Sequence, residues 1–186
     1  MEKNNEKQEI MTMTAEAEKE RIKTVTILLT RYSTLFSRFI CGISKNHYSH
    51  AAISIDGNEE LFYSFNCKGF VVEKPKKRKP RTQRAGSICI RMQVPESTYA
   101  LIKEELDYFL EHRERYAFSR LGVALCVLHI PHKFKNRYFC SQFVAEILAR
   151  AGAVELEKKE SLYMPGQLLD RMKSVYSEKQ IIVDGI

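Results

Sequence analysis

The sequence predicts an α+β domain in which helices pack on an antiparallel sheet. Several short apolar segments with strand-like alternation lie before residue 94, and Asp56-Gly57-Asn58 joins two of them as a hairpin signal. Most segments with helical periodicity follow from residue 95 onward. A sheet built from neighbouring hairpin strands, with helices laid on it, is typical of the α+β class.

The first half of the chain supplies most of the predicted strands. The run TVTILLT from Thr24 predicts a buried strand, and the apolar spacing in Tyr32–Ile43 predicts a helix. Alternation and turn residues then predict four more strands, at Ser49–Asp56, Glu60–Asn66, Gly69–Glu73 and Gly86–Gln93.

The second half supplies most of the predicted helices. Pro95-Glu96-Ser97 is typical of a helix start, and the expected buried face comprises Ile102, Leu106, Phe109 and Leu110. Further helices are predicted at about 118–128 and 137–151, the latter ended by Gly152. A last helical turn at Leu168–Met172 and a final strand at Gln180–Val183 complete the expected elements.

Length and composition indicate one globular domain. The chain has 186 residues, of which 44% are apolar, and this content excludes an intrinsically disordered protein. Its 8 Gly and 5 Pro exclude the collagen-like class. We expect a mobile charged tail over residues 1–21 and a single domain over 22–186. The longest uncharged apolar run, Leu121–Ile130, is about half of a membrane span, so no membrane span is expected. Five cysteines without a C-x-x-C pair, and no apolar leader, favour a cytoplasmic protein.

The positive charge is concentrated in one short segment. The net charge is +7, and residues 74–84 (KPKKRKPRTQR) contain seven basic residues, so the rest of the chain is balanced. This segment is expected to be an exposed basic loop that either keeps the protein soluble or binds an anionic partner. Because no aromatic residues are interleaved with the cations, nucleic acid is a disfavoured partner.

Cys140 is the strongest candidate for a nucleophile. The segment FCSQFVAEIL around it carries an apolar stripe, which predicts a helix packed on the sheet, with Cys140 in the first turn. Free backbone N–H groups and the helix dipole at that position stabilise a thiolate, and the same N–H groups can bind an oxyanion. The alternative is that Cys140 is a small buried hydrophobic residue.

His50 is the candidate base for this thiol. In the predicted strand, alternation places His50 on the same face as Ala52 and Ser54, whose small side chains leave room for the Cys140 helix. The alternative is a hydrogen-bonded core histidine. A third polar group should orient the imidazole. Ser64 is the preferred candidate, Asn66 the substitute, and Glu60 lies nearer the hairpin.

No metal or cofactor is expected. Cys126, His129 and His132 form a C-x-x-H-x-x-H spacing that resembles a zinc site. Pro131 interrupts any continuous helix through these residues, and no fourth ligand is near in sequence, so zinc is disfavoured.

These motifs together resemble the circularly permuted NlpC-type papain-like proteins, a branch that also holds lecithin retinol acyltransferase-like enzymes. The resemblance covers about Thr24–Met172. It is carried by a His that opens a strand (YSHAAISI), a strand ending YSFNCKGF, and a later helix that opens FCSQFVA. The order of His before Cys is that of the permuted branch.

The resemblance implies a papain-like fold in which Cys140 is the nucleophile, His50 the general base and Ser64 the third residue. A serine there departs from the family's usual His, Glu, Asn or Gln. We therefore expect a cysteine protease or amidase, a hydrolase that acts on a peptide or other amide substrate.

Two alternatives remain open. The first is a thiol acyltransferase or lipid hydrolase of the same fold, disfavoured because the sequence shows no membrane anchor or apolar surface. The second is a non-catalytic scaffold that binds an acidic partner through residues 74–84.

Overall fold

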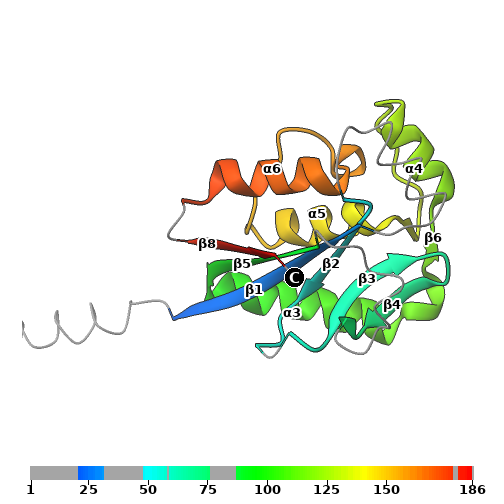
Figure 1. The fold of residues 1–186 in the computed structure, drawn as a ribbon. Coiled ribbons are helices and arrows are strands. Elements are labelled where there is room, and N and C mark those ends of the chain that lie inside the picture. The colour runs from blue at the N-terminus through cyan, green and yellow to red at the C-terminus, as the bar shows by residue number, and fades with distance from the viewer. Residues whose placement is uncertain (1–20, 32–47, 58, 76–86, 178–179, 186) are drawn as a thin grey trace, which may run out of the picture.

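The structure is a computed structural model that describes residues 21–31, 48–57, 59–75, 87–177 and 180–185. Its main sheet is antiparallel throughout, in the order β4–β3–β2–β1–β5–β8 (Figure 1). In chain order the strands are β1 (Ile22–Thr30), β2 (His50–Ser54), β3 (Phe62–Asn66), β4 (Gly69–Glu73), β5 (Ile88–Pro95) and β8 (Ile181–Gly185). The expected α+β class with an antiparallel sheet is confirmed.

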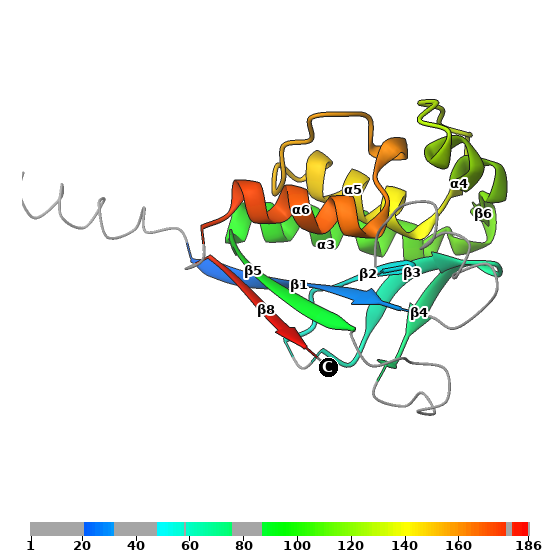
Figure 2. The same ribbon diagram turned by 45° about the horizontal axis from the view of Figure 1, so that its top comes forward.

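Four α-helices are present among the described residues: α3 (Glu96–Glu111), α4 (Arg120–Val127), α5 (Cys140–Arg150) and α6 (Pro165–Val175). Figure 2 shows that α3, α5 and α6 lie on one side of the sheet, with α4 beyond the N-terminal end of α5. The short strands β6 (Ala117–Phe118) and β7 (Arg137–Tyr138) pair in parallel beside α4. None of the helices in the described part of the chain combines the length and apolarity that spanning a bilayer requires.

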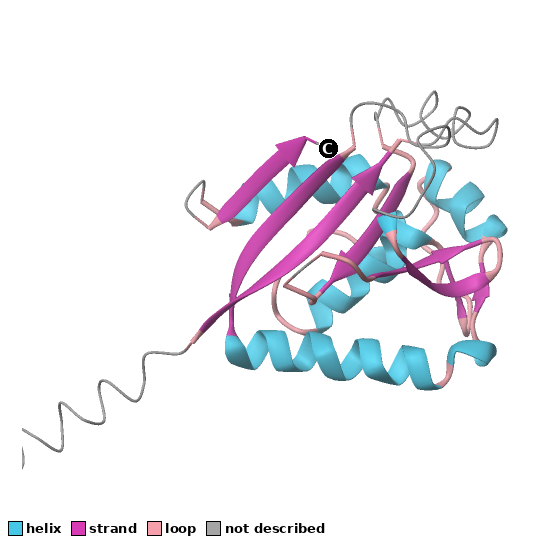
Figure 3. Cartoon of the chain, turned by 60° about the horizontal axis from the view of Figure 1, so that its bottom comes forward, coloured by secondary structure: helices cyan, strands magenta, loops and turns pink. Residues whose placement is uncertain are grey.

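β1 lies inside the sheet between β2 and β5, and its second half is buried on both faces. Val25, Ile27 and Leu29 are fully buried in the core that the helices cover. On the opposite face, Leu28 packs in a smaller buried cluster with Ala52, Phe62 and Cys89. Figure 3 shows the sheet from this side, with the helices behind it. Burial on both faces removes the alternation expected of a half-exposed strand.

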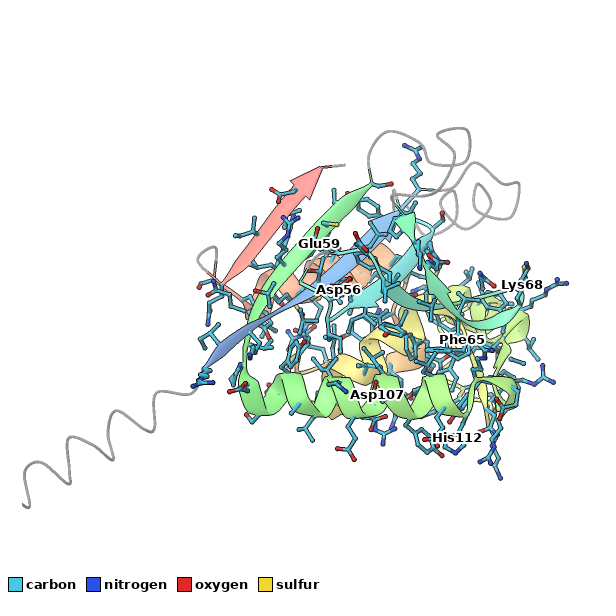
Figure 4. The ribbon with its side chains drawn as sticks, turned by 90° about the horizontal axis from the view of Figure 1, so that it is seen from below. Asp56, Glu59, Phe65, Lys68, Asp107 and His112 are labelled. Carbon is cyan, nitrogen blue, oxygen red and sulfur yellow. The ribbon has the colours of Figure 1, made fainter. Side chains whose placement is uncertain are left out.

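An aromatic cluster holds the β3–β4 hairpin against the helices. The Phe65 ring lies 5.6 Å from Phe70 and 5.2 Å from Phe143 of α5, and Phe109 of α3 lies 5.0 Å from Phe143. Figure 4 shows Phe65 between the hairpin and α3. Edge-to-face and tilted pairs at these centroid distances add stability beyond area burial. The hairpin is therefore attached to the layer that carries Cys140.

Most expected elements are present, although their bounds and buried faces differ in places. The helix expected at 137–151 begins at Cys140, because Arg137 and Tyr138 pair with β6. Leu110, expected on the buried face of α3, is 37% exposed. The last helix is longer than Leu168–Met172 because Pro165 occupies its first position, where a missing N–H costs no hydrogen bond. The helix at 32–43, the tail at 1–20 and the basic residues at 76–84 lie outside the described residues.

The hairpin turn requires glycine at position 69. Gly69 has φ +97°, and a Cβ there would lie 2.6 Å from the backbone oxygen of Tyr116. We expect Gly69→Ala to lower the free energy of unfolding by about 2 kcal/mol or more, through strain and displacement of β6. Gly57→Ala is the matched control, because a Cβ at Gly57 meets nothing within 4 Å. Urea denaturation measures both, and equal stability of the two variants would contradict this account.

Candidate active site

The start of α5 leaves backbone donors without a side-chain cap. Phe139 is the N-cap residue in an extended conformation, and its side chain cannot accept a hydrogen bond. Intrahelical bonding begins with Phe143 N–H, which donates to Phe139 O at 3.0 Å. The N–H groups of Cys140, Ser141 and Gln142 therefore have no intrahelical acceptor, and they point toward the beginning of the helix. This is the local positive potential that the sequence predicted for Cys140.

β1 holds His50 at the beginning of β2. Thr30, the last residue of β1, pairs with His50, and Ser49 N–H donates to Thr30 O at 3.0 Å. His50 is buried although it lies at the end of a strand. Both candidate residues are therefore the first residues of their elements, and each is placed by the backbone that precedes it.

The structure brings Cys140 and His50 together. A side-chain hydrogen bond joins the Cys140 thiol and the His50 imidazole, although 90 positions separate them in the chain. Backbone N–H groups of Ala51 and Ser141 also donate to the sulfur. Three donors thus converge on one sulfur atom, an arrangement that stabilises a thiolate.

Glu73, the last residue of β4, supplies the third group of the site. Its Oε2 lies 3.1 Å from His50 Nε2, and the two side chains are only 4% and 6% exposed. Because Nε2 faces the carboxylate, the ring nitrogen available to the thiol is Nδ1. The sulfur, imidazole and carboxylate therefore form a linear Cys–His–Glu chain of hydrogen bonds, the arrangement of a catalytic triad.

The electrostatics of the site favour an ion pair between sulfur and imidazole. Burial by itself lowers the pKa of His50, but hydrogen bonds to Cys140 and Glu73 and their negative charges outweigh burial and raise it to about 10. Burial alone raises the pKa of Cys140, yet the hydrogen bond and charge of His50, with the Ala51 and Ser141 N–H groups, bring it below its ordinary value of 9.0. Both shifts stabilise thiolate with imidazolium.

Ser64, the expected third residue, does not orient the imidazole. Its hydroxyl is buried and donates to the backbone oxygen of Ala51 at 2.6 Å. Ser64 therefore supports the peptide that follows His50, and it is Glu73 that contacts the ring. The alternatives also lie elsewhere, because Asn66 accepts from Lys68 N–H and Glu60 N–H donates to Asp56. Glu73 is the only acidic residue within β2, β3 and β4, but the longer strands predicted from the sequence also included Asp56 and Glu60, so acidity alone did not single it out.

The packing of α5 on β2 also differs from the expectation. Ala51 and Ile53 share the core with Phe143 and Val144 of α5, whereas Ala52 belongs to the cluster on the opposite face. The helix therefore covers the Ala51 face, not the face of His50, Ala52 and Ser54. Cys140 reaches His50 because both lie at the ends of their elements, so no gap in the strand surface is needed.

The residues of the zinc-like spacing are not brought together as a metal site. Cys126 is buried in α4, whereas His129 and His132 are exposed in the segment after it. No group of three or more metal-ligating side chains occurs within the described ranges. His112 lies half-buried at the end of α3 (Figure 4), and its ring centroid is 4.4 Å from that of Tyr108.

Comparisons with known proteins give no assignment. A scan against protein-family models found no match to this chain, and a search of curated proteins found none either.

The lowered pKa of Cys140 predicts a thiol that reacts faster than an ordinary cysteine. Because His50 lowers the pKa of Cys140, we expect iodoacetamide to alkylate Cys140 at about pH 6 faster than the exposed Cys67. His50→Ala should slow alkylation of Cys140 about tenfold or more, because the thiol loses its hydrogen bond and counter-charge. Peptide mass spectrometry follows each cysteine. His112→Ala is the matched control, and equal labelling of all thiols would contradict the ion pair.

Glu73 and Ser64 differ in what they support. Glu73→Gln removes the charge that raises the pKa of His50, so we expect slower alkylation of Cys140 at about pH 6, by about tenfold. Ser64→Ala removes only a buried hydrogen bond and should lower the free energy of unfolding by about 1 kcal/mol. Its alkylation rate should stay within about twofold of the parent. The reverse pattern would restore Ser64 as the orienting residue.

Proposed function

We propose that this protein is a cysteine hydrolase that cleaves amide bonds with a Cys140–His50–Glu73 triad. The observation that carries the proposal is the hydrogen-bonded chain from the sulfur through the imidazole to a buried carboxylate. We further propose that the fold is papain-like and circularly permuted. Support comes from the order of His before Cys, a Cys at the first position of a helix and a His at the first position of a strand.

The first half of the reaction forms an acyl-enzyme. The Cys140 thiolate attacks the carbonyl carbon, a C–S bond forms, and the carbonyl electron pair moves to oxygen. N–H groups in the first turn of α5, which have no acceptor within the helix, stabilise this oxyanion. The C–N bond then breaks as the amine takes the proton from His50 Nδ1 and leaves. Glu73 keeps its hydrogen bond to Nε2, so the ring does not turn between these steps.

The second half releases the acyl group with water. His50, now neutral, takes a proton from water, and the resulting hydroxide attacks the thioester carbon. The C–S bond breaks, the carboxylic acid leaves and the thiolate–imidazolium pair is restored. All proton transfers use one ring nitrogen, so the proposal needs no group outside the described triad and the backbone around it.

An activated ester tests whether the thiol can form the proposed intermediate. We expect p-nitrophenyl acetate to acetylate Cys140 as a thioester, detected by intact mass and reversed by hydroxylamine. Cys140→Ser should abolish this adduct, and His50→Ala should slow its formation and hydrolysis by about a thousandfold. A panel of fluorogenic peptide amides then measures turnover. If Cys140 is inert, or acetylates equally in His50→Ala, the protein is a non-catalytic scaffold and the proposal fails.

A further inference from the structure

α4 is apolar on the face that it buries and on the face that it exposes. Its buried side consists of Gly122, Val123 and Cys126, which pack toward Phe139 and Met164. A helix that is hydrophobic all round is normally enclosed by protein. This one is not, because Leu121 is 59% exposed, and Leu128 and Ile130 just after the helix are 65% and 48% exposed.

These three residues form one surface. Leu121 and Leu128 are seven positions apart, which places them on the same side of the helix. The chain then turns back at His129, whose φ is +58°, and Ile130 N–H donates to Leu125 O at 2.9 Å. Ile130 is therefore held against the last turn of α4. We call Leu121, Leu128 and Ile130, with the cations described next, the α4 surface.

The charged residues of α4 and of the segment that follows it are all basic. Residues 115–145 contain five Lys or Arg and no Asp or Glu. Lys133 pairs with Glu146 at 2.7 Å and lies 3.9 Å from the Glu160 carboxylate. The other exposed cations on α4 and the segment after it are Arg120, Lys135 and Arg137, and none of them forms an ion pair with another described residue. By contrast, the exposed apolar residues of α3 are Leu101, Tyr108 and Leu110, and most of the charged residues of that helix are acidic.

The α4 surface borders the candidate active site. Its buried side packs on Phe139, the residue that precedes Cys140. Burial raises the pKa of Cys126 to about 11, and the charge of Cys140 acts in the same direction, so α4 lies within electrostatic reach of the sulfur. Figures 1 and 2 show α4 at the same end of the molecule as the first turn of α5.

We propose that the α4 surface docks on an anionic lipid bilayer, with Leu121, Leu128 and Ile130 entering the headgroup boundary and Arg120, Lys135 and Arg137 facing lipid phosphates. Exposed aliphatic side chains flanked by unpaired cations match that boundary, which is apolar below and negatively charged above. Nucleic acid fits less well, because it offers phosphate but no apolar layer for three aliphatic side chains. Docking would bring the Cys140 end of α5 to the membrane surface.

This inference goes beyond the proposed hydrolysis and does not rest on it. Three apolar side chains and three cations are few enough that binding should be reversible. Each cation near an anionic surface strengthens binding about fivefold, and salt screens that attraction. The lipid hydrolase alternative was disfavoured because the sequence shows no apolar surface. The α4 surface supplies one, so that reason no longer holds.

The absence of tryptophan from the chain allows a site-specific test. Leu128→Trp places a single reporter on the α4 surface, and Leu101→Trp places one on α3 as the matched control. With vesicles of phosphatidylcholine and phosphatidylglycerol, we expect the emission of Leu128→Trp to shift to shorter wavelength and to be quenched by brominated lipid. Leu101→Trp should show neither effect. Equal responses, or no response at Leu128→Trp, would overturn the proposal.

Vesicle co-sedimentation measures which side chains contribute. We expect Leu121→Ser/Leu128→Ser/Ile130→Ser and, separately, Lys135→Gln/Arg137→Gln to weaken binding about tenfold or more. Leu101→Ser/Tyr108→Ser should bind as the parent does, and thermal unfolding checks that each variant is folded.

Parent-like binding by the triple variant would overturn the proposal, as would equal binding to pure phosphatidylcholine. Light scattering gives a further test. If the unmodified protein is a dimer and the triple variant is a monomer, the α4 surface binds a second copy of the chain, and the proposal is overturned. Cys140→Ser should bind like the parent, so failure of catalysis leaves this test intact.

Discussion

The site depends on the hydrogen bond between His50 and Glu73, 3.1 Å long and almost completely buried. A carboxylate so far from water is costly unless a cation or strong donor faces it. The imidazolium meets that requirement at Nε2, and the same contact leaves Nδ1 for Cys140. One buried interaction therefore satisfies Glu73, orients the ring and stabilises the thiolate, so the three groups depend on one another.

The surrounding packing explains how residues from three distant segments meet. Glu73 ends the β3–β4 hairpin, and the hairpin is attached to α3 and α5 through Phe65, Phe109 and Phe143. The same α5 begins with Cys140. The aromatic cluster thus couples the strand that carries the carboxylate to the helix that carries the sulfur. A change in this cluster, remote from the chemistry, would shift one end of the hydrogen-bonded chain relative to the other.

The sequence was sufficient to predict residues whose local context carries the chemistry, and insufficient where tertiary arrangement decides. Cys140 and His50 could be singled out because a helix start and a strand start are local features. Glu73 could not, because its role depends on β4 joining β3 on the far side from β1 and on the hairpin bringing its last residue toward β2. It also directly precedes the basic run at 74–84, which made it look like part of a charged loop. The prediction of which face of β2 the helix covers was wrong for a related reason. Alternation separates the two faces of a strand but does not show which one a helix will cover.

The charge state of His50 tests the central claim most directly. Heteronuclear NMR of the histidine side chains, with His50→Ala for assignment, follows the protonation of each ring nitrogen with pH. Because the ordinary pKa of 6.5 is raised to about 10 by Cys140 and Glu73 against the effect of burial, the His50 ring should carry protons on both nitrogens at neutral pH and lose one only in alkaline solution. A His50 ring that is neutral at neutral pH, or that loses its proton near the ordinary pKa of 6.5, would contradict the thiolate–imidazolium pair.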